Sequence, residues 1–171
     1  MDWAFYSVKF VFAEKKITTF DPFILLFMTI NEIQQEIIEE FSVYEDWMDK
    51  YSYLIELGND LKDLDPKEKT DQHLIKGCQS RVWLVSDFVD GKIVFRGESD
   101  AVIVKGLVAL LLRVVSNRTP AEIIENELFF VDAIGLKQHL SPTRSNGLLA
   151  MMKQIKLYAV AYQKISGKEK E

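Results

Sequence analysis

The chain has 171 residues, enough for one domain with its own core, and its composition of 48% hydrophobic and 27% charged residues is ordinary for a globular protein. A net charge of −5 and the lack of a run of basic residues argue against nucleic acid as a partner. The single cysteine, Cys78, excludes an intramolecular disulfide, a paired redox motif and a zinc site built from several thiolates, and it suits a reducing compartment.

Residues 1–27 differ from the rest of the chain, with scattered aromatic residues and no clean helical pattern. The apolar stretch "FILLF" at residues 23–27 is too short to span a membrane, and no signal-peptide cleavage pattern follows it. Two interpretations stay open, namely an appended extension with Met28 as the working start, or a docked strand or helix. We therefore divide the chain into an extension over 1–27, a domain over 28–165 and a frayed tail over 166–171.

A first helix is predicted directly after Met28. Thr29 and Glu32 form the pattern of a capping box, which satisfies backbone N–H groups at a helix start. Apolar residues then recur on one helical face at Ile30, Ile33, Ile37 and Phe41.

A second helix is expected to open in the same way, with Ser42 as the cap and Glu45 closing the box. Its pattern ends at Gly58, a residue that commonly terminates helices. Residues 59–75 are polar and contain an Asp–Pro step, so they predict a long loop of the kind that often carries function.

The segment after Cys78 predicts a β-hairpin followed by a buried helix. "RVWLVSDF" at 81–88 and "KIVFRG" at 92–97 are rich in strand formers and are joined by a tight Asp–Gly turn. The next segment is apolar nearly all round, so we predict a buried central helix capped by Ser99 or Asp100. Its Lys105 and Arg113 argue against a membrane span.

Two further helix starts follow. Thr119, Pro120 and Glu122 make a capping box with proline at the first helical position. "SPTR" at 141–144 opens the last helix. Its apolar stripe is predicted at Leu148, Met152, Ile155, Ala159 and Tyr162. The order of elements predicts an α+β fold in which a small antiparallel β-sheet packs against helices.

Cys78 stands where the polar loop passes into the first strand, not on an apolar stripe. We therefore expect it near the surface, where the cations Lys76 and Arg81 would favour the reactive thiolate. Its local context leaves a reactive and a structural cysteine equally open.

Three functions are compatible with a lone cysteine. A cysteine-nucleophile enzyme would need a histidine base, and His73 and His139 are the candidates. A sulfur carrier needs only one accessible thiolate, which attacks the outer sulfur of a persulfide on another protein. In an interaction domain with an inert cysteine, replacing Cys78 would leave the function intact.

Several motifs resemble the SufE/CsdE family of sulfur acceptors over residues 30–163. They are "IELG" at 55–58, "IKGCQSRVWL" at 75–84, "GESDAVIVKGLVALL" at 97–111, "TPAEI" at 119–123 and "LKQHLSPTRSNGLLAMM" at 136–152. Residues 1–27 fall outside the family pattern. The resemblance implies the α+β fold that this family shares with IscU scaffold proteins.

The resemblance also implies a function. Family members take persulfide sulfur from a SufS-like cysteine desulfurase, stimulate that enzyme, and deliver the sulfur to a SufBCD-like scaffold for iron–sulfur cluster assembly. The chain would then be a cytoplasmic accessory protein, not an enzyme, that binds no cofactor or metal, because the desulfurase carries the pyridoxal phosphate. A homodimer is compatible with the resemblance, and neither nucleic acid nor membrane is expected.

The resemblance assigns the site residues in turn. Cys78 is the sulfur acceptor, Gly77, Gln79 and Ser80 shape its loop, and Asp100 and Arg144 match an aspartate after the hairpin and an arginine near the partner surface. Glu98 stands where members often have aspartate. The family is thought to shelter its cysteine in an apolar hollow, and we expect docking to draw the loop out.

Overall fold

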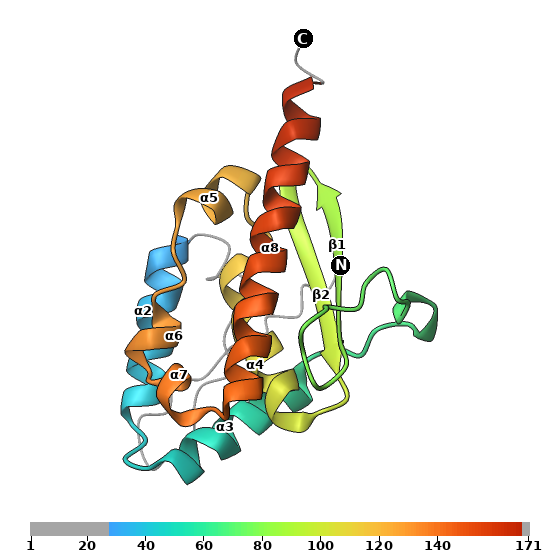
Figure 1. The fold of residues 1–171 in the computed structure, drawn as a ribbon. Helices are drawn as coiled ribbons and strands as arrows, with labels where there is room; N and C mark the ends of the chain where they lie inside the picture. The colour runs from blue at the N-terminus through green and yellow to red at the C-terminus, as the bar shows by residue number, and fades with distance from the viewer. Residues whose placement is uncertain (1–27, 169–171) are drawn as a thin grey trace, which may run out of the picture.

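The computed structural model describes residues 28–168, and its helices and two-stranded antiparallel sheet confirm the predicted α+β fold (Figure 1). The extension predicted over residues 1–27 lies outside the described residues. In chain order the elements are α2 (Ile30–Ser42), α3 (Trp47–Asp60), the 3₁₀ turn η1 (Pro66–Glu68), β1 (Val82–Val89), β2 (Lys92–Ser99), α4 (Val102–Val115), α5 (Pro120–Glu125), α6 (Phe130–Ala133), α7 (Leu136–His139) and α8 (Pro142–Lys168).

The first helix, α2, begins as its sequence predicts. The Thr29 hydroxyl accepts a hydrogen bond from the Glu32 N–H, and the Glu32 carboxylate accepts one from the Thr29 N–H. Every member of the predicted apolar face is buried. The capping box therefore sets the start of the helix, and burial of one face holds it in place.

The prediction for the second helix is wrong at both ends. Its cap is Asp46, whose carboxylate accepts from the Asp49 N–H at 2.9 Å, whereas the Ser42 hydroxyl donates back to the Glu39 carbonyl. A hydroxyl engaged with its own helix is not available as a cap for the next one. Gly58 does not end the helix, which continues to Asp60.

The predicted hairpin forms, with Val82 opposite Ser99 and Val89 opposite Lys92. Asp90 and Gly91 make the two-residue turn, and both have positive φ, of 50° and 77°. That backbone matches the right-handed twist of the two strands.

The segment between α3 and β1 covers the outer face of the hairpin. The Glu98 carboxylate accepts from the Leu64 N–H at 2.9 Å and from Lys69 Nζ at 2.6 Å, and Arg96 forms an ion pair with Glu68. An isolated bridge between Leu74 and Trp83 extends the sheet beyond β1. The long loop is thus pinned to the hairpin along much of its length.

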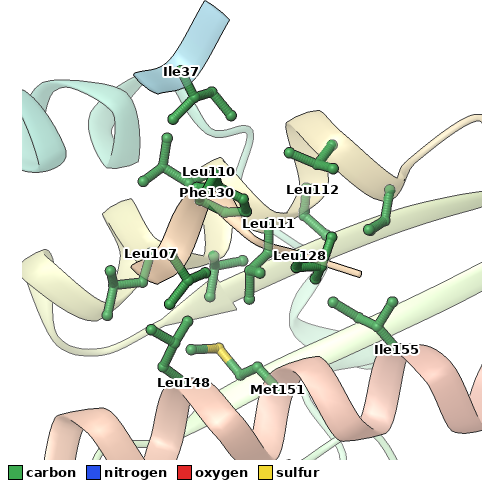
Figure 2. Close-up of a cluster of buried hydrophobic side chains, with 14 of the residues drawn as sticks. Ile37, Leu107, Leu110, Leu111, Leu112, Leu128, Phe130, Leu148, Met151 and Ile155 are labelled. Atoms are coloured by element: carbon green, nitrogen blue, oxygen red, sulfur yellow. The ribbon is translucent and has the colours of Figure 1, made fainter. Parts of the chain in front are cut away.

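The apolar helix, α4, is the centre of the molecule, as predicted. It contacts α2, α3, α8 and β2, and Figure 2 shows its leucines between Ile37 of α2 on one side and Met151 and Ile155 of α8 on the other. Its two charged residues are paired, Lys105 with Asp63 and Arg113 with Glu40. Among the helices of residues 28–168, none is long and apolar enough to cross a membrane.

The last helix, α8, runs along the hairpin and α4, and its C-terminal part projects beyond the rest of the fold (Figure 1). The predicted stripe is buried at Leu148, Ile155 and Ala159, but Met151 takes the fully buried position and Met152 is only half-buried. The helix continues through residue 168, into the tail predicted over residues 166–171, and residues 169–171 lie outside the described part.

Two glycines let α3 and α4 cross at close range. A Cβ added to Gly58 would lie 2.8 Å from the backbone nitrogen of Gly106, and one added to Gly106 would meet the backbone carbonyl of Leu54. A methyl group at either position could not be accommodated by a side-chain movement, because the contact is between the two helix backbones. Gly58, predicted as a helix stop, is therefore a packing residue inside its helix.

We expect Gly106→Ala to destabilise the fold. Alanine favours a helix over glycine by about 1 kcal/mol, but overpacking a rigid contact costs about 2–3 kcal/mol, so the steric term should win. The free energy of unfolding, measured by urea denaturation, checks this. Ser52→Ala on the exposed side of α3 is the control and should change it by less than about 0.5 kcal/mol. An alanine variant as stable as the wild type would contradict the close crossing.

Candidate functional site

Cys78 lies in a short loop whose entry is held by backbone hydrogen bonds. The Leu84 N–H donates to the His73 carbonyl at 2.9 Å, and the Ile75 N–H donates to the Val82 carbonyl at 2.8 Å. The chain before the cysteine is therefore bonded to the start of β1. Residues 76–81 are left to form the loop itself.

The cysteine packs against the second turn of α8. Its thiol Sγ lies 3.6 Å from the Gly147 carbonyl, to which it donates, and a Cβ added to Gly147 would be 3.2 Å from Sγ. Cys78 is thus half-buried, and burial raises the pKa of its thiol. Neighbouring cations were expected to favour the thiolate, whereas desolvation disfavours it here.

A hollow of about 300 Å³ opens beside the thiol. Its lining residues are Cys78, Gln79, Ser80, Val104, Ser141, Thr143, Arg144 and Gly147. Most of these side chains are polar, so the hollow is not the apolar one that the resemblance implied. Its size would admit a small group on the thiol, with hydroxyl, amide and guanidinium groups at hand as hydrogen-bond donors.

Arg144, which the resemblance matched to an arginine near the partner surface, lines this hollow. It lies in the first turn of α8, is exposed to solvent, and makes no ion pair with any residue between 28 and 168. A cation near a helix N-terminus is mildly unfavourable. The guanidinium is therefore available to an anionic group that approaches Cys78.

Asp100 lies at the exit of the loop and does not line the hollow. Its carboxylate accepts from the backbone N–H and from Nε of Arg81, both at 3.0 Å. The Ser99 hydroxyl donates to the Arg81 carbonyl. The N-cap of α4 is Ala101, without a side-chain bond, so the prediction that Ser99 or Asp100 caps this helix is wrong.

Asp100 instead pins the backbone three residues after Cys78. It also pairs with the charge of Arg81, which was predicted to activate the thiol. The Arg81 guanidinium lies over the Trp83 ring, 5.5 Å from its centroid, and this contact orients it further.

Glu98 is a supporting residue that sequence reasoning noted only as a departure from the family pattern. It sits two residues before Asp100 on β2, and its side chain is 13% exposed. Through Leu64 and Lys69 it holds the segment that leads to Cys78. The signal in the sequence was the alternation of β2, which puts Glu98 on the same side of the strand as Arg96, the ion-pair partner of Glu68.

Neither histidine supports the cysteine-nucleophile enzyme. His73 places Nδ1 2.7 Å from the Glu68 carbonyl oxygen, and His139 stacks on Trp47 with ring centroids 3.9 Å apart. The hollow beside Cys78 contains neither ring. The geometry therefore offers no histidine base to this thiol.

Gly77, the remaining predicted loop residue, has φ of +92°. A Cβ there would come within 3.9 Å of the Ala150 Cβ, and the left-handed backbone would be strained for any other residue. Gly77 thus lets the loop turn against α8. Within residues 28–168, no cluster of three or more histidine, cysteine or acidic side chains could hold a metal ion.

The chain is similar to known proteins over most of its length. Residues 35–159 match the family model SufE, described as an Fe-S metabolism associated domain. An uncharacterised SufE-like protein of Rhizobium meliloti (strain 1021) is 41% identical over 126 residues, which cover 71% of this chain and 90% of that protein. The solution structure of a hypothetical protein from Thermus thermophilus shares the fold, with a TM-score of 0.64 and 19% identity over 77% of this chain and 96% of that one.

The contact between Gly147 and Cys78 yields a prediction. Because a methyl group at 3.2 Å from Sγ must push the loop aside, Gly147→Ala should expose the thiol and speed its alkylation about two- to fivefold at neutral pH. The rate with iodoacetamide, followed by intact mass, checks this. Asn146→Ala, on the exposed neighbouring position, should leave the rate unchanged. Slower alkylation in the Gly147→Ala variant than in the wild type would mean that the loop closes further, and it would contradict the prediction.

Proposed function

The chain belongs to the SufE family, which is associated with Fe-S metabolism, and we propose that Cys78 accepts sulfur from the persulfide of a cysteine desulfurase. The observation that carries the proposal is the half-buried thiol beside a polar hollow, with a guanidinium at its rim that forms no ion pair with any described residue. Sulfur carriage needs one thiol and room for one added sulfur atom, and it needs no base triad or metal.

The transfer step balances without another reactant. The Cys78 thiolate attacks the outer sulfur of the donor's persulfide and forms a new S–S bond. The S–S bond of the donor breaks, its cysteine leaves as a thiolate, and Cys78 carries the persulfide. Sulfur moves between two proteins, so this chain is an accessory protein and not an enzyme with a small-molecule substrate.

The raised pKa of Cys78 supports a sheltered resting state. In the free protein the thiol stays mostly protonated at neutral pH, which slows reaction with unrelated electrophiles. Docking of the donor would draw the loop away from Gly147 and return the thiol to a polar environment. Gly77 would supply the backbone freedom for that movement.

The neighbouring residues have distinct proposed roles. Arg144 is the cation that would attract the anionic persulfide, or pair with an acidic residue of the desulfurase. Gln79 and Ser80 line the hollow and would donate hydrogen bonds to the carried sulfur. Asp100, through Arg81, would set how easily the loop opens.

The remaining partners follow from the same proposal. A SufS-like desulfurase with its own pyridoxal phosphate is the donor, and its turnover rises because this chain removes the product sulfur. A SufBCD-like scaffold would receive the sulfur for cluster assembly. The chain itself would need no cofactor, would act in the cytoplasm, and can form a homodimer.

The proposal predicts a sulfur gain that depends on one residue. With desulfurase and free cysteine, the intact mass of the wild type should rise by one sulfur, and sulfide release under reducing conditions should increase. Cys78→Ser should show neither effect while keeping its fold. Sulfur gain on the serine variant, or none on the wild type with a matched desulfurase, would refute the acceptor role.

A second prediction concerns Asp100. Because Asp100 and Arg81 are partly exposed, their contact contributes about 0.5–1 kcal/mol to closing the loop, so Asp100→Ala should speed alkylation of Cys78 about two- to fivefold. Global stability should change little, since Asp100 caps no helix.

Asp87→Ala is the matched control for that experiment, because Asp87 pairs with Arg96 on the hairpin. It should leave the alkylation rate unchanged. Loss of global stability in Asp100→Ala without faster alkylation would show that Asp100 supports the fold and not the loop.

A further inference from the structure

The charges of the chain are sharply divided between α8 and the rest. The chain has 21 basic and 26 acidic residues. Five of the basic residues and none of the acidic ones lie in α8, so 16 basic and 26 acidic residues remain elsewhere. A long helix with only positive charges is unusual in an acidic protein, because mixed charges at spacings of three and four stabilise exposed helices.

The helical period sorts the α8 residues onto two faces. One face is buried against the core through Leu148, Met151, Ile155 and Ala159. The opposite face, here called the outer stripe, is exposed and consists of Leu149, Lys153, Lys156, Leu157, Val160 and Lys164. Its apolar members are exposed by 46% at Leu149, 52% at Leu157 and 38% at Val160.

The outer stripe has no partner within residues 28–168. None of its three lysines forms an ion pair with a described residue, and apolar side chains lie between them. If the only role of these lysines were to keep the protein soluble, exposed leucine and valine side chains between them would serve no purpose. Apolar side chains can form the buried centre of an interface, and charges around them steer a complementary protein toward it.

The stripe is continuous with the cysteine site. Lys153 and Leu157 line a groove of about 440 Å³ between α8 and residues 71–76, and Lys76, which also lines it, is two residues before Cys78. Gly147, which contacts the thiol, lies six residues before Lys153 on the same helix. A protein that reaches Cys78 along this groove would cover Lys153 and Leu157.

We propose that the outer stripe of α8 is a docking surface for an acidic, partly apolar surface of the cysteine desulfurase. This inference rests on the proposed function and adds to it the chemistry of the interface. Carboxylates of the donor would pair with Lys153 and Lys156, and its apolar side chains would cover Leu157 and the adjacent groove. Such pairing orients the donor before the sulfur atoms meet and raises the rate of encounter.

A protein fits this stripe better than a nucleic acid or a lipid surface does. A phosphate backbone would leave Leu149, Leu157 and Val160 uncovered, and three lysines are fewer than the clusters of about four to eight basic residues that bind anionic lipids. The donor is favoured over other proteins because it must bring its persulfide into contact with Cys78, two residues after the lysine that lines the groove.

The test is a binding measurement in which no sulfur is transferred. The full chain is titrated into the desulfurase without free cysteine by calorimetry. Lys153→Glu/Lys156→Glu should weaken binding about tenfold at low ionic strength, and the loss should shrink as salt screens the charges. The control is Lys62→Glu/Lys67→Glu, which makes the same change in net charge at exposed lysines outside the stripe and should stay within about twofold of wild type.

A second variant separates charge from apolar contact. Leu157→Ser should weaken binding several-fold at every salt concentration, because its side chain is exposed in the free protein and covered in the complex. Circular dichroism confirms that each variant is folded. Equal affinities for the wild type, the lysine variant and the control would overturn the docking surface.

The remaining outcomes are equally decisive. Sulfur gain on Cys78 with unchanged affinity in the lysine variant would refute the stripe and leave the acceptor role standing. Weaker binding of that variant, with no sulfur gain on any form, would refute the acceptor role and leave the stripe standing. Unchanged donor affinity, but lost binding to a scaffold or to phosphatidylserine vesicles, would assign the stripe to that other partner and overturn the proposal.

Discussion

The whole fold depends on the burial of α4. Nine of its 14 residues are buried, on nearly every side of the helix, so no single partner could shield it from water. Helices α2, α3 and α8 and strand β2 each cover part of it, and the two glycines at the α3 crossing bring one of these elements to backbone contact. Burial of apolar surface is the dominant stabilising contribution to folding. In this protein, α4 forms the centre of the hydrophobic core in which that surface is buried.

The cysteine site forms where three of these elements meet. Strand β2 must cross α4 and then turn into it, which places Glu98 and Asp100 at the junction. Helix α8 must cover α4 from the other side, which brings Gly147 and Arg144 to the same corner. Cys78 lies between them because its loop joins β1 at that end of the hairpin. The position of the site therefore follows from the way β2 and α8 pack on α4. Few contacts within the site itself are needed to hold it together.

The sequence predicted those parts of the structure in which local and tertiary preferences agree. The Thr29 and Thr119 capping boxes, the Asp90–Gly91 turn and the buried helix α4 all formed as expected, because each is supported by backbone chemistry and by burial at once. The cap at Ser42 and the stop at Gly58 failed, because a back-bonded hydroxyl and a close helix crossing competed with the local signal. Motifs identified Cys78 and Arg144, whereas the half-burial of the thiol and the contact of Asp100 with Arg81 depend on elements distant in sequence.

The pinning of the loop limits how far the thiol can travel. Ile75 is bonded to β1 on one side, and Arg81 is bonded to Asp100 on the other, so Cys78 is three residues from either anchor. Three residues span at most about 11 Å when fully extended. A carrier with so short a tether cannot swing its sulfur between distant sites. In the proposed transfer, the protein that gives sulfur to Cys78 and the protein that takes it away must each come to nearly the same point on the surface, and so the two cannot be bound there together.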